Sequence, residues 1–298
     1  MSSSLAVAVV GLGRMGAAMA ARLRSAGADV VVFNRTPSNA RQVAEATGAR
    51  IAVTAAEAAA AAPVVLVSLA DDRAVIATYQ GESGLLAGVG ARTVVADTST
   101  VDPRTVAAMA VLLADRGARL VDAPVSGSVQ SAAAGTLTVL AGGDAADLDV
   151  ARPALDVLAQ RVFHVGPSGA GAVMKLAVNT LVHGLNQALS EALVLAERAG
   201  VERGTAYEVI AASVAGAPFV QYKRAAFEHP QATPVAFTLD LVAKDLALAL
   251  ALGERVGARL PQATTNSEAV ADAIAAGLGR SDMSALAQAL RDERGSGR

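Results

Sequence analysis

Polar side chains recur at spacings of three and four residues along one otherwise apolar stretch, 169–200: Lys175, Asn179, His183, Asn186 and Ser190. Residues with this spacing lie on one face of an α-helix. The other positions are mostly Leu, Val, Ala and Met, so we expect one long, largely buried helix, Ala172 to Ala199, with a single polar stripe. At about 1.5 Å per residue this helix would extend roughly 40 Å, which is enough to cross a domain boundary.

Lys175 is the residue of this stripe that could do chemistry. An ammonium group can polarise a carbonyl oxygen and deliver a proton to it as negative charge develops there. Most lysines instead lay their stems on apolar surface and hold the ammonium in water. Lys175 lies one helical turn from Asn179 among apolar residues, which favours a catalytic ammonium in a cleft between domains.

The first forty residues have the order strand, glycine turn, helix, strand. The apolar run Leu5–Val10 precedes a G-x-G-x-x-G turn, and the β-rich run Asp29–Phe33 follows a helical segment. In this setting the glycines permit a tight turn, the approach of a pyrophosphate to the backbone, and close packing of helix on strand. An ordinary strand-to-helix turn is the alternative, but the two flanking strands favour dinucleotide binding. The predicted contacts are Gly11, Leu12, Gly13, Arg14, Met15 and Gly16.

The residues after the second strand bear on the choice of dinucleotide. An NAD site uses a carboxylate here for the ribose hydroxyls, whereas this chain has Asn34, Arg35 and Thr36. An arginine can pair with a 2′-phosphate through its planar fork, and a threonine can donate its hydroxyl. Arg35 could also be a solvated loop residue. We expect NADP(H) in preference to NAD(H), with these three residues among its contacts.

Strand-like and helical runs continue to alternate through the first half of the chain. Further strands are expected at Arg50–Thr54, Pro63–Leu69, Arg92–Ala96, Ala118–Val121 and Arg161–Val165. This alternation predicts an α/β domain, a doubly wound parallel sheet of the Rossmann type with helices on both faces. Ligands of such sheets bind beyond the carboxyl ends of the strands, where Leu69, Ala70 and Thr100 fall.

Ser126, Gly127 and Ser128 follow the strand expected at 118–121. Small residues after a strand can turn their backbone N–H groups toward an anion, and serine hydroxyls add donors. A substrate carboxylate would suit such a site. The Ser/Gly turn of a hairpin explains the same residues equally well.

Beyond Gly200 no strand-like alternation of any length is found. Helices are expected at Arg203–Ala215, Gln221–Phe227, Leu239–Gly253, Pro261–Ala276 and Ser281–Asp292. The charged tail 291–298 is expected to fray. The Gly-Pro-Ser-Gly break before the long helix sets the domain boundary. It gives a dinucleotide-binding domain, 1–166, and an all-α domain, 167–298, joined by that helix.

Composition narrows the class of protein. The chain has 298 residues, a net charge of −2 and a pI near 6.0, so nothing attracts it as a whole to nucleic acid or to an anionic membrane. The absence of cysteine excludes disulfides, thiolate catalysis and cysteine-ligated metal, and leaves the cytoplasm as the default compartment. The three histidines lack ligand spacing, so no metal is expected. The N-terminus is interpreted as a strand and not as a signal peptide.

Five motifs, in order and over nearly the whole chain, resemble those of the β-hydroxyacid dehydrogenase family. They are GLGRMGAAMA at 11–20, DTSTVDP at 97–103, DAPVSGSVQSAAAGTL at 122–137, GAGAVMKLAVN at 169–179 and KDLALAL at 244–250. Within the family the chain is most similar to the branch that reduces glyoxylate and succinic semialdehyde. That branch is similar in its Asn-Arg-Thr after the second strand, its serine at Ser128, and a phenylalanine, here Phe237, eight residues before Asp245.

The resemblance implies roles for residues in both domains. Lys175 is implied as the catalytic lysine, with Asn179 beside it. The residues implied for the substrate are Ser126, Gly127, Ser128, Phe237 and Asp245, and those implied for the cofactor are Thr100 and Lys244. The resemblance also implies homo-oligomers, a dimer or a tetramer, formed through the helical domain. It assigns no role to His183.

We therefore expect an NAD(P)-dependent oxidoreductase, NADPH-preferring, that transfers hydride between the nicotinamide and a small carboxylate-bearing aldehyde or hydroxyacid. Glyoxylate or succinic semialdehyde is the expected type of substrate. One alternative is an NAD(P)-dependent 3-hydroxyisobutyrate or other 3-hydroxyacid dehydrogenase. A second is an imine reductase, against which Lys175 argues because those enzymes typically carry Asp or Tyr there. A third is a non-catalytic dinucleotide-binding module, which would not need Lys175, Asn179 or Ser126.

Overall fold

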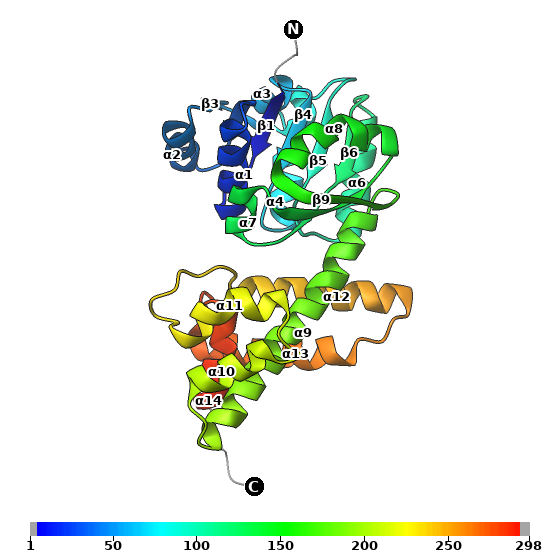
Figure 1. Ribbon diagram of the computed structural model, residues 1–298. Helices are drawn as coiled ribbons and strands as arrows, with labels where there is room; N and C mark the ends of the chain where they lie inside the picture. Colours follow the sequence, from blue (N-terminus) through cyan, green and yellow to red (C-terminus); the bar gives the residue numbers. More distant parts are fainter. Residues whose placement is uncertain (1–4, 293–298) are drawn as a thin grey trace. The chain divides into compact units, whose positions relative to one another are not determined.

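The computed structural model describes residues 5–292. The chain divides into two compact units, 1–175 and 176–298, and the division falls inside the long helix. The first unit combines a sheet with helices, and the second is built of helices throughout its described part (Figure 1). The predicted fold class, a Rossmann-type sheet domain followed by an all-α domain with a long helix, is confirmed. The tail expected to fray lies, beyond Asp292, outside the described residues.

The strands of the first unit form one sheet. They are β1 (Ala6–Val10), β2 (Asp29–Phe33), β3 (Arg50–Ile51), β4 (Val64–Val67), β5 (Val94–Asp97), β6 (Arg119–Asp122), β7 (Val125–Ser126), β8 (Leu137–Gly142) and β9 (Ala159–Gly166). The helices between them are α1 (Arg14–Ser25), α2 (Pro37–Thr47), α3 (Ala55–Ala60), α4 (Asp72–Tyr79), α5 (Leu85–Gly88), α6 (Pro103–Ala114), α7 (Val129–Ala134) and α8 (Ala145–Leu158). The strand order is β3-β2-β1-β4-β5-β6-β8-β7, with β9 paired to β8.

The sheet is parallel from β3 to β6 and changes direction at β8. β8 is antiparallel to β6, where Asp122 pairs with Gly142, and antiparallel to β7. β9 then runs parallel to β8. The prediction of a parallel sheet therefore holds from β3 to β6 and is wrong at this edge. The connection 127–136 joins β7 to β8 as a hairpin, because a parallel crossover needs roughly a dozen residues or more.

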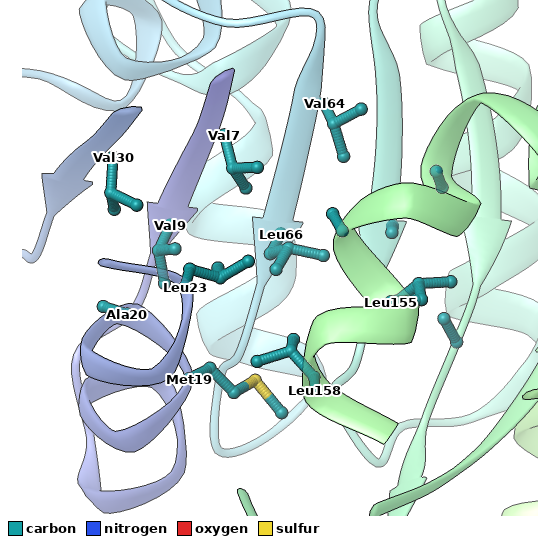
Figure 2. Packing of buried hydrophobic residues seen from close by; sticks show 14 of the residues in the cluster. Val7, Val9, Met19, Ala20, Leu23, Val30, Val64, Leu66, Leu155 and Leu158 are labelled. Atoms are coloured by element: carbon teal, nitrogen blue, oxygen red, sulfur yellow. The ribbon is translucent and has the colours of Figure 1, made fainter. Parts of the chain in front are cut away.

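The central strands are buried on both faces. Val9 of β1 lies in one hydrophobic core with Met19 of α1 and Leu158 of α8 (Figure 2). The next residue, Val10, belongs to the other core, which includes Leu113 of α6. Helices cover both faces, so these strands are continuous apolar runs without polar alternation. Because the faces are covered, a ligand can reach the sheet at the strand ends and at the loops that follow them.

The second unit is organised along the long helix. Its elements are α9 (Ala170–Arg198), which begins in the first unit, α10 (Arg203–Ala212), α11 (Pro218–Glu228), α12 (Leu239–Val256), α13 (Pro261–Ala273), a π-helical turn η1 (Ile274–Leu278), a 3-10 turn η2 (Met283–Ala285) and α14 (Leu286–Asp292). The prediction of one helix from Ser281 is wrong at its start, because the side chain of Asp282 accepts the N–H of Ser284 (3.1 Å) and caps a separate turn there. No helix in residues 5–292 has the length and apolar character needed to span a membrane.

Helix α9 buries its polar stripe. It spans 29 residues, about 43 Å. Four residues of the stripe are at most 7% exposed: Asn179, His183, Asn186 and Ser190. Leu181 and Leu195 of the same helix are 67% and 72% exposed. The expectation that the apolar faces are the buried ones is therefore wrong at these positions, because the stripe finds polar partners inside the second unit. One of them is the carbonyl oxygen of Met283, which accepts from Asn186 Nδ2 (2.9 Å).

Candidate active site

The turn between β1 and α1 requires glycine at two positions. Gly11 has a φ of +90°, and a Cβ on Gly16 would overlap the carbonyl oxygen of Gly11. Helix α1 begins at Arg14, after Gly13, and no side chain of the described residues caps its first N–H groups. Uncapped N–H groups at a helix N-terminus attract phosphate. The turn therefore fits the pyrophosphate of a dinucleotide.

Asn34 ties the end of β2 to this turn. Its Oδ1 accepts a hydrogen bond from the N–H of Leu12 (2.8 Å), and its Nδ2 donates to the carbonyl oxygen of Thr36 (3.1 Å). Arg35 and Thr36 are exposed beside it. The structure thus brings the residues predicted to meet a 2′-phosphate next to the glycine turn, and it uses the Asn34 side chain as the link.

Two further loops follow strands that end at the same edge of the sheet. Because β1, β4 and β5 are parallel, the loops at Leu69 and Thr100 lie on the side of the sheet where Gly11 lies. β1 and β4 are also the neighbours between which the order of strands reverses, and such sheets bind ligands there. The N–H of Leu69 donates to Ser99 Oγ (2.9 Å), which joins the two loops. Ala70 is exposed and Thr100 is half-buried.

A buried carboxylate supports the loop after β5. Asp97 Oδ1 accepts the N–H of Ser99 (2.9 Å), and its Oδ2 accepts the hydroxyl of Tyr79 (2.8 Å). Burial raises the pKa of Asp97, and these hydrogen bonds offset only part of the effect. Asp97 is 5% exposed, so its role is to hold the backbone at 98–100.

The segment 126–128 leads from the end of β7 into the connection to β8. It consists of Ser126, Gly127 and Ser128. The two strands pair antiparallel, so the backbone follows the hairpin interpretation. Ser128 Oγ accepts the N–H of Ser131 (3.1 Å), and Ser131 Oγ accepts the N–H of Ser128 (3.2 Å), which caps α7. The Ser128 oxygen therefore serves the helix. Ser126 is half-buried and Gly127 is exposed, so these two residues are better placed to meet a ligand.

Lys175 and Asn179 lie on one continuous helix. Helix α9 carries both residues, four positions and about 6 Å of rise apart, and such pairs share a face. The side chain of Lys175 is half-buried, and Asn179 is 7% exposed. Helix geometry thus fixes the spacing of the predicted catalytic lysine and its neighbour.

A buried carboxylate gathers the predicted residues of the second unit. Asp245, on α12, is 1% exposed, and its Oδ2 accepts Asn179 Nδ2 (2.5 Å). Asp245 Oδ1 lies 3.0 Å from Lys244 Nζ, and Oδ2 lies 3.6 Å from His183 Nε2. Burial by itself raises the pKa of Asp245, but His183 and Lys244 outweigh it and lower the pKa. The carboxylate is therefore charged and can orient the groups around it.

Phe237 lies beside the same carboxylate cluster. Its ring centroid is 5.9 Å from that of His183, with the planes inclined at 33°. Its N–H donates to Asp282 Oδ2 (3.2 Å), and Asp282 pairs with the buried Lys223 (2.6 Å). The structure thus brings together the predicted site residues of this unit: Asn179, Phe237, Lys244 and Asp245.

His183 is the member of this cluster that the sequence analysis left without a role. It is 4% exposed, and neither ring nitrogen has a hydrogen-bond partner among the described residues. Its Nε2 lies 3.6 Å from the carboxylate of Asp245, which also holds Asn179, so we add His183 to the candidate site. The signal was present in the sequence, because His183 follows Asn179 by four residues on the polar stripe.

Two family descriptions match the chain in succession. Residues 6–166 match the NAD binding domain of 6-phosphogluconate dehydrogenase, and residues 169–290 match the NAD-binding region of NADP-dependent 3-hydroxyisobutyrate dehydrogenase. The chain belongs to the 3-hydroxyisobutyrate dehydrogenase-like family of β-hydroxyacid dehydrogenases. It is accordingly an NAD(P)-dependent oxidoreductase that acts on a CH–OH group. The family and the enzyme class predicted from the sequence are confirmed.

Similar β-hydroxyacid dehydrogenases match over nearly their whole length. 2-(Hydroxymethyl)glutarate dehydrogenase of Eubacterium barkeri is 36% identical over 96% of this chain and 95% of its own. Glyoxylate/succinic semialdehyde reductase 1 of Arabidopsis thaliana is 35% identical over 97% of this chain and 99% of its own. The solved structure of Mycobacterium tuberculosis 3-hydroxyisobutyrate dehydrogenase with L-serine is 32% identical, covers 97% of this chain and 99% of its own, and has a TM-score of 0.83.

The site residues of this β-hydroxyacid dehydrogenase suit a dinucleotide. The glycine turn and the uncapped start of α1 provide a cradle for phosphate. Among residues 5–292 no three His, Cys, Asp or Glu side chains are grouped so that they could hold a metal ion.

Proposed function

We propose that this β-hydroxyacid dehydrogenase is an NADPH-dependent reductase of a small aldehyde that bears a carboxylate, of the glyoxylate or succinic semialdehyde type. The observation that carries the proposal is the placement of Lys175 one turn of helix α9 before the oriented amide of Asn179. Asn179 Nδ2 is fixed by the buried Asp245 at 2.5 Å. A proton donor and a fixed polar group on one helix face are what carbonyl reduction needs.

The substrate type is argued from the residues near Asp245 and from the relatives. Phe237, eight residues before Asp245, and Ser128 are the features that resemble the glyoxylate and succinic semialdehyde branch. The Arabidopsis relative, whose name gives these two substrates, is 35% identical to this chain. Relatives named for 3-hydroxyisobutyrate and 2-(hydroxymethyl)glutarate are similarly close, so pocket shape decides among the acids.

NADP(H) is the proposed cofactor, and it supplies or accepts the hydride when bound. The end of β2 carries Arg35 and no carboxylate, which suits a 2′-phosphate. Domain 1–166 would hold the dinucleotide, and domain 167–298 would hold the substrate and form the homodimer or homotetramer. The proposed cofactor contacts are Gly11, Leu12, Gly13, Arg14, Met15, Gly16, Asn34, Arg35, Thr36, Leu69, Ala70, Thr100 and Lys244.

Lys175 acts on the oxygen of the substrate carbonyl. In reduction its ammonium donates a hydrogen bond to that oxygen and gives it a proton as negative charge develops. In oxidation the neutral amine removes the proton from the hydroxyl. Ser126 and Gly127, with Ser128 beside them, donate hydrogen bonds to the substrate carboxylate. Phe237 and Asp245 are the proposed substrate residues of the second domain.

A substrate panel tests the proposed function. NADPH oxidation is followed with glyoxylate, succinic semialdehyde, methylmalonate semialdehyde, tartronate semialdehyde and a cyclic imine. We expect the highest kcat/KM with glyoxylate or succinic semialdehyde. A higher value with methylmalonate semialdehyde would make the protein a 3-hydroxyisobutyrate dehydrogenase, and turnover of none of the panel would favour a non-catalytic dinucleotide-binding protein.

Replacement of the lysine tests the mechanism. Lys175→Ala removes the proton donor, so we expect kcat to fall by about 10²- to 10⁴-fold. The affinity for NADPH is expected to change little, since the β1–α1 turn is untouched. The chain has no Trp, so the fluorescence of bound NADPH can be followed without tryptophan background. Normal turnover by Lys175→Ala would remove Lys175 from the mechanism.

A further inference from the structure

A buried carboxylate fixes the start of the helix that carries Lys175. Asp122 is the last residue of β6 and is 1% exposed. Its Oδ1 accepts the N–H of Gly169 (2.8 Å), and its Oδ2 accepts the N–H of Ala172 (2.9 Å). The first N–H groups of a helix have no partners within the helix. Asp122 therefore caps α9 from a position 47 residues earlier in the chain.

Two glycines make room for this carboxylate. A Cβ on Gly142 of β8 would lie 2.6 Å from Asp122 Oδ1 and 2.7 Å from the backbone nitrogen of Gly171. A Cβ on Gly171 of α9 would overlap the carbonyl oxygen of Leu140 and would lie 2.8 Å from Asp122 Oδ2. β6, β8 and α9 can therefore meet at this point only because neither glycine has a side chain.

Asp122 connects the two segments of the first unit that carry its proposed chemistry. They are the Ser126 segment and the start of helix α9, which carries Lys175. The chain continues from it through the buried residues 123–125 to Ser126. Its hydrogen bond to Ala172 fixes the helix three residues before Lys175. The backbone of Asp122 is paired with both β5 and β8, so the carboxylate itself cannot shift freely. One side chain thus sets the Ser126 segment and the Lys175 helix relative to each other.

We propose that Asp122 is a positioning residue of the reaction, which holds Lys175 in register with the segment that binds the substrate carboxylate. The proposal rests on the proposed function for the roles of Lys175 and Ser126. As a positioning residue, Asp122 contacts neither substrate nor cofactor. It acts through the position of the helix, because a reacting group displaced by about 1 Å can cost a factor of about 100 in rate.

The first test compares Asp122→Asn and Asp122→Ala with the wild-type protein. An amide keeps one acceptor oxygen and loses the other, so we expect kcat to fall about 10-fold in Asp122→Asn and about 100-fold in Asp122→Ala. The Kd of NADPH should stay within about 3-fold, because the phosphate turn keeps its geometry. Rates are given per NADPH-binding site, so that a loss of folded protein does not count as a loss of kcat.

The second test keeps the carboxylate and disturbs its surroundings. Gly142→Ala pushes a methyl group against Asp122 Oδ1, whereas a Cβ on the exposed Gly90 meets nothing within 4 Å. We expect Gly142→Ala to lower kcat in the same direction as Asp122→Asn, and Gly90→Ala to leave it unchanged. Hydrogen exchange should quicken at the amides of Gly169 and Ala172 in both Asp122 variants and in Gly142→Ala.

The outcomes separate this proposal from the proposed function. An active wild-type enzyme whose kcat per site survives both Asp122→Asn and Gly142→Ala would overturn the positioning role alone. Unchanged amide exchange at Gly169 and Ala172 in these variants would overturn the cap itself. A wild-type protein that turns over none of the substrate panel would refute the proposed function, and the exchange measurement would still decide whether Asp122 holds α9.

Discussion

At the scale of single residues, lysine and arginine occupy different kinds of position in this chain. The chain has three lysines among its 25 basic residues, and each lies in an ion pair or at the proposed site of proton transfer. Lys223 is 1% exposed and pairs with Asp282, Lys244 pairs with Asp245, and Lys175 is the proposed proton donor. An ammonium is compact and can lose its proton when desolvated, whereas a guanidinium stays charged. The remaining Lys and Arg positions are arginines, among them Arg35, whose planar fork suits a phosphate.

Arg35 permits a test of cofactor choice. Arg35→Asp removes the proposed charge-assisted partner of the 2′-phosphate, so we expect the Kd of NADPH to rise about 10- to 100-fold. The Kd of NADH should stay the same or fall, because a carboxylate there can accept the ribose hydroxyls. Titration of each nucleotide by its own fluorescence measures both values. Arg152→Asp, on α8, is the control and should change neither. Equal weakening of NADPH and NADH would contradict the 2′-phosphate assignment.

At the scale of elements, α9 is a helix whose polar side is inside. Asn179, His183 and Asn186 meet Asp245, Phe237 and the backbone of Met283, whereas Leu195 is exposed. A buried polar group is tolerated only when it finds partners, so the stripe selects one orientation of the helix against α12 and η2. The same orientation turns Asn179 toward Asp245.

A matched pair of leucines tests the orientation of α9. Leu193 is fully buried and Leu195, two residues later, is 72% exposed. We expect Leu193→Ala to cost about 2–5 kcal/mol of unfolding free energy and Leu195→Ala to stay within about 0.5 kcal/mol. Urea unfolding followed by circular dichroism measures both. If Leu195→Ala proved as costly as Leu193→Ala, another surface, such as a second copy of the chain, would have to cover that face.

At the scale of the whole molecule, a buried ion pair joins three segments that are separate in the sequence. Lys223 Nζ lies 2.6 Å from Asp282 Oδ1, and Asp282 Oδ2 also accepts the N–H groups of Ala236 and Phe237. α11, the loop before α12 and the turn η2 are therefore held at one carboxylate. Burial raises the pKa of Asp282, but the charge and hydrogen bond of Lys223 outweigh it and lower the pKa.

The lowered pKa of Asp282 predicts how stability depends on pH. The carboxyl has a lower pKa in the folded chain than in the unfolded one, where it is about 3.9. Its contribution is therefore present above about pH 4 and is lost as the pH falls through the folded pKa. Asp282→Asn removes the carboxylate charge that lies 2.6 Å from the buried Lys223 Nζ, so we expect a loss of about 3–5 kcal/mol at pH 7 that shrinks toward pH 2.

Thermal or urea unfolding between pH 2 and 7 measures this difference. Asp29→Asn is the matched control, because the Asp29–Arg50 pair is exposed, with side chains 47% and 59% accessible. An exposed pair contributes about 0–1 kcal/mol, so the control should follow the wild-type curve closely. A gap between wild type and Asp282→Asn that stays constant down to pH 2 would contradict the role of the carboxylate charge.

Local signals predicted the parts of the fold whose causes are local. The glycine turn at 11–16 is marked by its spacing of glycines between two apolar runs, and the helix from Ala170 to Arg198 is marked by its period and the absence of proline. The antiparallel pairing of β8 with β6 was not predicted, because it depends on the pairing of Asp122 with Gly142 across intervening chain. Within the candidate site, the spacing of Lys175 and Asn179 was predictable, whereas the grouping of Phe237 with His183 was not.

The sequence by itself determined the family, the order of the two kinds of domain, and the position of Lys175 on a long helix, because motifs and helical periodicity are properties of adjacent residues. Only the tertiary structure decided that the polar stripe of α9 is the buried one and that Asp122 caps this helix. Each of those facts depends on contacts between residues far apart in the chain, such as Asn179 with Asp245 and Asp122 with Ala172. Distant partners decide which polar groups can be buried, since a buried group must be paired wherever its partner lies in the sequence.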